Sequence, residues 1–77
     1  MEKIRNAKVL AAAFYRETGE PAGSPREEEI VLAENEMFKD CKTIVDIHRR
    51  YESFWNDLNP DSDAVVFVQS IRINQDY

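Results

Sequence analysis

The chain has 77 residues, of which 43% are hydrophobic and 32% are charged, and its formal net charge is −5. This length allows one small domain spanning residues 1–77, with a thin core and little room for an enclosed catalytic pocket, and the acidic balance argues against direct binding of nucleic acid, which needs a basic face. A single cysteine excludes an internal disulfide, and the apolar runs are much shorter than the roughly 18 residues of a membrane-spanning helix, so we expect a cytoplasmic protein with no membrane partner.

The first segment, residues 3–17, is compatible with two conformations. As a helix it places Ile4, Leu10 and Phe14 on one stripe, and its alanines favour that conformation. As a strand it has two apolar faces, as a central strand of a sheet has. Local propensity favours the helix, and both alternatives stay open.

The next segment begins with a predicted loop, because residues 18–26 contain both glycines and two of the three prolines. Residues 25–38 are again ambiguous. Ser24, Pro25 and Glu27 form a good helix start, whereas the residues up to Phe38 can equally form a strand.

An acidic block lies in the same region, since residues 17–36 hold seven glutamates against one arginine. Such a block is usually a solvated face. Its other interpretation is a partner-binding surface, for which the candidates are Glu27, Glu28, Glu29, Glu34 and Glu36.

Residues 40–58 predict an amphipathic helix with Asp40 as its N-cap. Its apolar side chains gather on one half of the helical wheel, which indicates that the helix packs on a hydrophobic surface, most simply one face of a sheet. We expect this half to supply structural core residues: Ile44, Ile47, His48, Tyr51, Phe54, Trp55 and Leu58.

The helix also holds the only thiol and the only imidazole of the chain, Cys41 and His48. If both lie on one helix, their α-carbons are roughly 10 Å apart along its axis, which is too far for the roughly 3 Å contact of a nucleophile and its base. We therefore expect Cys41 to be a small core residue, and His48 to pack in the core and pair with Glu52 one turn on.

A possible calcium loop begins at Asp57, but it departs from the calcium-loop pattern. Ser62 and Val68 stand where that loop needs glycine and glutamate. We therefore predict no metal ligand, and in addition no catalytic residue, no cofactor and no small-molecule substrate.

The last segment, residues 64–74, is rich in β-branched residues and predicts a strand. Strict alternation places Val65, Phe67 and Ile71 on one face as core residues, and Val66 and Val68 on the other. A lone strand would leave both of its edges unpaired, so it needs partners, and the segments 5–17 and 27–37 are the candidates.

We therefore predict an α+β fold: a small three-stranded antiparallel sheet with one amphipathic helix packed on one face, in the order β-β-α-β. The runner-up is a mostly helical domain whose C-terminal strand pairs with its copy in a dimer. One helix leaves the second sheet face bare, and on strict alternation Val66 and Val68 would lie on it.

Two functions follow as expectations. The first is a small non-catalytic protein–protein interaction or regulatory module, which binds another protein or itself as a homodimer through the apolar sheet face. The alternative is a small acidic inhibitor that imitates nucleic acid and occupies the basic groove of a larger enzyme.

Overall fold

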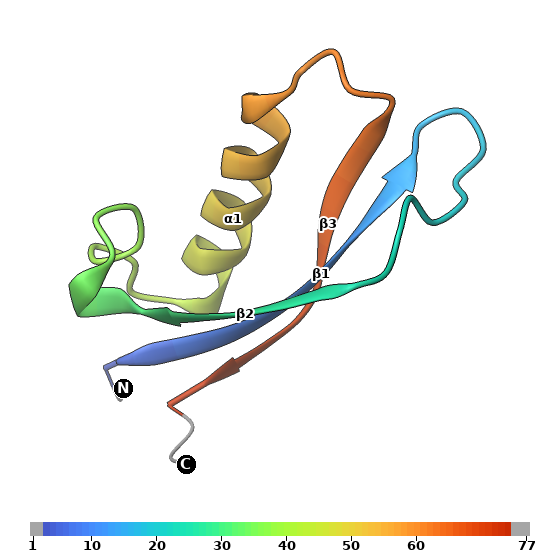
Figure 1. The fold of residues 1–77 in the computed structure, drawn as a ribbon. Helices are drawn as coiled ribbons and strands as arrows, with labels where there is room; N and C mark the ends of the chain where they lie inside the picture. Colours follow the sequence, from blue (N-terminus) through green and yellow to red (C-terminus); the bar gives the residue numbers. More distant parts are fainter. Residues whose placement is uncertain (1–2, 75–77) are drawn as a thin grey trace.

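The computed structural model describes residues 3–74 and shows one sheet with one long helix beside it (Figure 1). The elements, in chain order, are β1 (Asn6–Tyr15), β2 (Arg26–Val31), the 3-10 turn η1 (Leu32–Glu34), α1 (Ile44–Leu58) and β3 (Ala64–Ile73). The strands are antiparallel in the order β2-β1-β3, and α1 packs against the sheet. The predicted β-β-α-β arrangement is confirmed, and both ambiguous segments contain strands.

The central strand is β1, although its alanines favour a helix. It pairs with β2 along one edge and with β3 along the other, and its residues Ala7 and Val9 are completely buried beneath the helix. Small side chains at these positions let α1 approach the sheet, and this packing outweighs the intrinsic helix propensity of the segment.

The predicted loop between β1 and β2 is a turn followed by an extended segment. Two backbone hydrogen bonds close the turn: Gly19 N donates to Tyr15 O at 2.8 Å, and Tyr15 N donates to Glu20 O at 2.9 Å. Gly19 has a φ of +74° and Gly23 a φ of +116°. These are backbone conformations that residues with a side chain rarely adopt, so the two glycines of the chain stand where the loop requires them.

The start of α1 differs from the prediction. Thr43, not Asp40, is the N-cap: Thr43 Oγ1 accepts from Asp46 N and Asp46 Oδ2 accepts from Thr43 N, both at 3.1 Å, which is a capping box. Cys41 therefore lies in the turn before the helix, buried against the core. Asp40 instead pairs with Arg50.

The core lies between α1 and the sheet, and Ile47 and Tyr51 are buried in it as expected. The expectation was wrong for Ile44 and Leu58, which are 43% and 56% exposed, and for His48, whose side chain is 45% exposed. Ile44 and Leu58 are the first and last residues of α1. α1 runs alongside β3, because Glu52 and Asn56 of the helix bond to Val68 and Val66 of the strand, and its two end residues lie outside the core cluster.

A β-bulge in β3 overturns the predicted alternation of that strand. Ala11 pairs with Val68 but Leu10 pairs with Ser70, so Gln69 is an extra residue. Before the bulge, Val66 and Val68 face α1; after it, Ile71 packs on the same core. The bare face therefore carries Val65 and Phe67 in place of Val66 and Val68, and neither Val65 nor Phe67 belongs to the core, contrary to the prediction.

Within residues 3–74, α1 is too short and too polar to cross a membrane.

Candidate interaction surface on the open face of the sheet

The sheet face opposite α1 is called the open face. Its members follow from the register, because directly paired residues point to the same side of a sheet and the buried odd-numbered residues of β1 point to the helix. The open face consists of Lys8, Leu10, Ala12, Phe14, Glu27, Glu29, Val31, Val65, Phe67, Ser70 and Arg72.

One half of the open face is apolar. The rings of Phe14 and Phe67 have centroids 6.0 Å apart and are tilted by 54°, which is a favourable aromatic geometry. Ala12, the register partner of Phe67, is only 6% exposed, whereas Phe67 itself is 49% exposed. Leu10 and Val65 are half-buried beside them. The result is an aromatic pair that stands on the sheet with one side in water.

The other half of the open face is charged and balanced. Glu29, Lys8 and Arg72 form one row across the three strands, because Lys8 pairs with Glu29 on one side and with Arg72 on the other. Glu27 lies beside this row and its Oε1 is 3.3 Å from Lys8 Nζ. Two acids and two bases thus occupy the end of the face away from the aromatic pair.

The acidic block is divided by the fold. Glu27 and Glu29 lie on the open face, whereas Glu28 pairs with Val9 and faces α1. Glu34 lies in η1, and Glu36 follows it in a turn where it pairs with Lys39 at 2.8 Å. The five glutamates therefore point in at least three directions and do not form one surface.

The outer edge of β3 is occupied by side chains of α1, a feature that sequence reasoning missed. Asn56 Oδ1 accepts from Val66 N at 2.8 Å and its Nδ2 donates to Val66 O at 3.2 Å, so the amide imitates a neighbouring strand. Glu52 Oε2 accepts from Val68 N at 2.8 Å and also pairs with His48 at 3.0 Å. The predicted His48–Glu52 pair is confirmed. For the bonds from α1 to the edge of β3, the sequence offered one signal: Glu52 is a charged residue at the apolar edge of the helical wheel.

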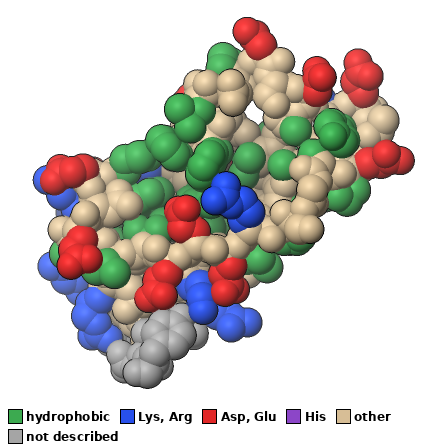
Figure 2. Space-filling model, in the orientation of Figure 1, with side chains coloured by type: hydrophobic (Ala, Val, Ile, Leu, Met, Phe, Trp, Pro, Cys, Tyr) green, Lys and Arg blue, Asp and Glu red, His purple; other side chains and the backbone are tan. Residues whose placement is uncertain are grey.

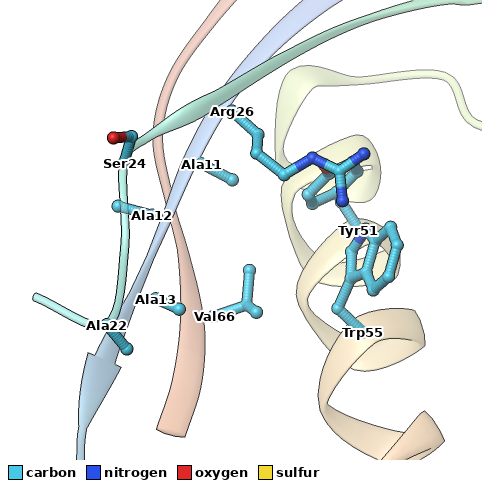
Figure 3. Close-up of a pocket in the computed structure, with 9 residues that line it drawn as sticks. All are labelled: Ala11, Ala12, Ala13, Ala22, Ser24, Arg26, Tyr51, Trp55 and Val66. Atoms are coloured by element: carbon cyan, nitrogen blue, oxygen red, sulfur yellow. The ribbon is translucent and has the colours of Figure 1, made fainter.

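A half-open groove of about 210 Å³ lies between α1 and the sheet. Figure 3 shows Ala11, Ala13 and Val66 pointing toward Tyr51 and Trp55 across it. The Arg26 guanidinium lies at its mouth, 5.5 Å from the centre of the Trp55 ring, which is a cation–π distance. Figure 2 views this side of the molecule, with apolar side chains gathered along its middle and most acidic ones toward its margins.

The groove can hold an apolar group of about one side chain, but its lining offers no nucleophile paired with a base. Tyr51 is the one titratable side chain of its inner wall, and burial, followed by the charge of Glu28, raises the pKa of its hydroxyl. It therefore stays neutral and serves as an apolar wall.

Cys41 and His48 do not form a reactive pair in the described part of the chain. Burial raises the pKa of the Cys41 thiol, which disfavours the thiolate that a nucleophile requires. His48 Nε2 is directed to Glu52. Residues 3–74 also contain no cluster of three or more side chains that could hold a metal ion.

Comparison of the chain with protein-family models, with curated proteins and with solved structures finds no match.

Proposed function

We propose that this protein is a non-catalytic protein-interaction module whose binding surface is the open face of the sheet. The observation that supports this is the aromatic pair of Phe14 and Phe67, with Phe67 49% exposed on a face that no element of residues 3–74 covers. Covering apolar groups with a partner is favourable, because it removes their surface from water. Aromatic residues are also enriched where protein interfaces bind most strongly.

The edges of the sheet are less suited to binding by strand addition. The backbone of β3 is already bonded to Asn56 and Glu52 at Val66 and Val68. The other edge is β2, which has six residues of which three are glutamates. Short, charged edge strands discourage the pairing of another strand. The flat face is therefore the better candidate.

The acidic-inhibitor hypothesis rests on charge alone. An imitation of nucleic acid needs negative charges in regular succession along one surface, and the five candidate glutamates are divided among the open face, the helix-facing side and the turn after β2. No contact or arrangement favours this function over the first.

Capture of a binding partner from the native host tests the proposal with two matched variants. Phe67→Thr removes the aromatic group from the open face, and because the side chain is half exposed, we expect it to cost only about 1 kcal/mol of stability. Val45→Thr is the control, since Val45 is 55% exposed on α1. We expect Phe67→Thr to lose the partner and Val45→Thr to keep it. Equal capture by both variants would refute the open face as the binding surface.

A further inference from the structure

The open face is ordered in rows that run across the strands. Beyond the pair of Asn6 and Val31, the first row with a member on each strand is Glu29, Lys8 and Arg72, and the next contains Leu10 with Glu27 and Ser70. The two rows beyond the bulge pair Ala12 with Phe67 and Phe14 with Val65. Charge thus changes along the strands, from a balanced charged end to an apolar end. Within the first row it also changes across the strands, from negative on β2 to positive on β3.

We propose that the occupant of the open face is a second copy of this chain, packed face to face about a two-fold axis that runs parallel to β1. This inference rests on the proposed function and names the partner of the same surface. Such an axis keeps each row level with its own copy and exchanges the β2 side with the β3 side. Glu29 then faces Arg72 of the partner subunit, and Arg72 faces Glu29 of the partner subunit.

The same axis brings the apolar halves together. Ala12 and Phe14 lie on β1, close to the axis, and then face the same residues of the partner subunit. Val65 and Phe67 of β3 lie beside them, over the β2 side of the partner subunit. The strands of the two sheets run in nearly the same direction, which is the aligned arrangement that twisted sheets adopt when they pack face to face.

A two-fold axis through the middle of the face and perpendicular to the strands is unfavourable. It would turn one copy end for end and lay the row of Glu29, Lys8 and Arg72 over the aromatic pair. These charges would lose water without gaining a partner, at a large cost. The distribution of charge therefore selects the axis along the strands.

Lys8 lies close to the proposed axis and faces its own copy. Its ammonium is directed toward Glu27, 3.3 Å away. The charged half of each subunit contains Glu27, Glu29, Lys8 and Arg72 and is neutral as a whole, so the two copies can meet without net repulsion in the interface.

The size of the face sets the expected strength. Three strands lie side by side only where β2 pairs with β1, over six residues, and β1 and β3 continue beyond it. Even the upper limit of roughly 33 by 14 Å is only about 460 Å² per subunit, in the range of weak and transient interfaces. We therefore expect a dimer that dissociates on dilution in the micromolar range.

Reciprocal charge reversal tests the geometry. Glu29→Lys and Arg72→Glu each replace two attractive contacts by two like-charge contacts, and we expect each variant alone to dissociate at about tenfold higher concentration than the unchanged protein. An equimolar mixture of the two variants restores both attractive contacts, and only in the mixed dimer. Sedimentation equilibrium of the separate and mixed variants measures this, with circular dichroism to show that each is folded.

Recovery of dimers on mixing is the expected result. If the unchanged protein forms dimers but the mixture of the two variants does not, the proposed two-fold axis is wrong. If the unchanged protein stays monomeric at a concentration of about 100 μM, self-association is wrong. Partner capture with Phe67→Thr would then still decide the proposed function. A dimer that is as stable with Phe67→Thr as without it would overturn both.

Discussion

Asp46 controls the start of α1 by accepting two backbone hydrogen bonds. Its Oδ2 is 3.1 Å from the amide nitrogens of both Lys42 and Thr43, and these bonds hold the pKa of the Asp46 carboxyl below its ordinary value of 3.8. Hydrogen bonds to the charged form stabilise it. The helix therefore begins where this carboxylate can be satisfied, three residues after the position that the apolar periodicity indicated.

Replacing Asp46 should make stability less dependent on pH in the acid range. A carboxyl with a lowered pKa in the folded state contributes stability that is complete above its unfolded pKa, near 4, and is lost as pH falls through its folded pKa. We expect Asp46→Asn to be less stable than the unchanged protein at pH 6, and the difference to shrink as the pH falls below 4. Urea unfolding at a series of pH values measures it.

The control for this prediction is Asp61→Asn, which removes the same charge from an exposed turn where the carboxylate accepts no hydrogen bond from residues 3–74. Its effect at pH 6 should be smaller. A stability difference for Asp46→Asn that is the same at pH 3 and pH 6 would contradict the assigned role.

At the scale of elements, α1 both covers the sheet and closes one of its edges. Asn56 supplies a donor and an acceptor to the backbone of Val66. Removing the amide leaves a backbone N–H and a C=O of a half-buried residue without partners, which costs about 1–2 kcal/mol. We expect Asn56→Ala to lose stability by this amount and to speed amide exchange at Val66. Urea unfolding and hydrogen exchange measure the two effects.

Ser53→Ala is the matched control, because it makes a similar change of helix propensity on the exposed side of α1, where the Ser53 hydroxyl donates to Asp57 within the helix. It should change neither stability nor exchange at Val66 by a comparable amount. If Asn56→Ala behaves as Ser53→Ala does, the edge contact contributes nothing.

The sequence predicted the elements better than their faces. The period of residues 40–58 and the β-branched run of 64–74 are strong local patterns, and the need of a strand for partners led from them to the correct β-β-α-β order. The bulge at Gln69 depends on the register between β3 and β1, which is a property of the pair of strands. One extra residue reverses the alternation, so the prediction chose Val66 and Val68 for the open face where the structure has Val65 and Phe67.

The candidate site could be predicted in kind but not in residues. A single helix on a sheet implies one open face, and the sequence showed that much. Which glutamates share that face depends on the order β2-β1-β3 and on the register of β2. Neither can be inferred from the residues of one segment alone. The bonds of Asn56 to β3 were missed for the same reason, since Asn56 belongs to the polar half of the wheel.

At the scale of the whole molecule, net charge and apolar surface act in opposite directions on association. Each chain carries −5, so two copies repel one another at long range, whereas the open face attracts them at contact. Salt screens charges beyond about 10 Å at 0.1 M and leaves apolar burial nearly unchanged or slightly stronger. The exposed pairs of Glu29 with Arg72 of the partner subunit contribute little in themselves, as surface ion pairs generally do.

The dissociation constant of the dimer should therefore stay constant or decrease between 50 and 500 mM sodium chloride. Sedimentation equilibrium at several salt concentrations measures this, and Phe67→Thr, which lacks the apolar contact, is the control that should remain monomeric throughout. An acidic protein bound to a basic groove would behave in the opposite way, because each screened charge weakens the complex. Association that weakens tenfold or more with salt would show that charge, and not the aromatic pair, holds the partner.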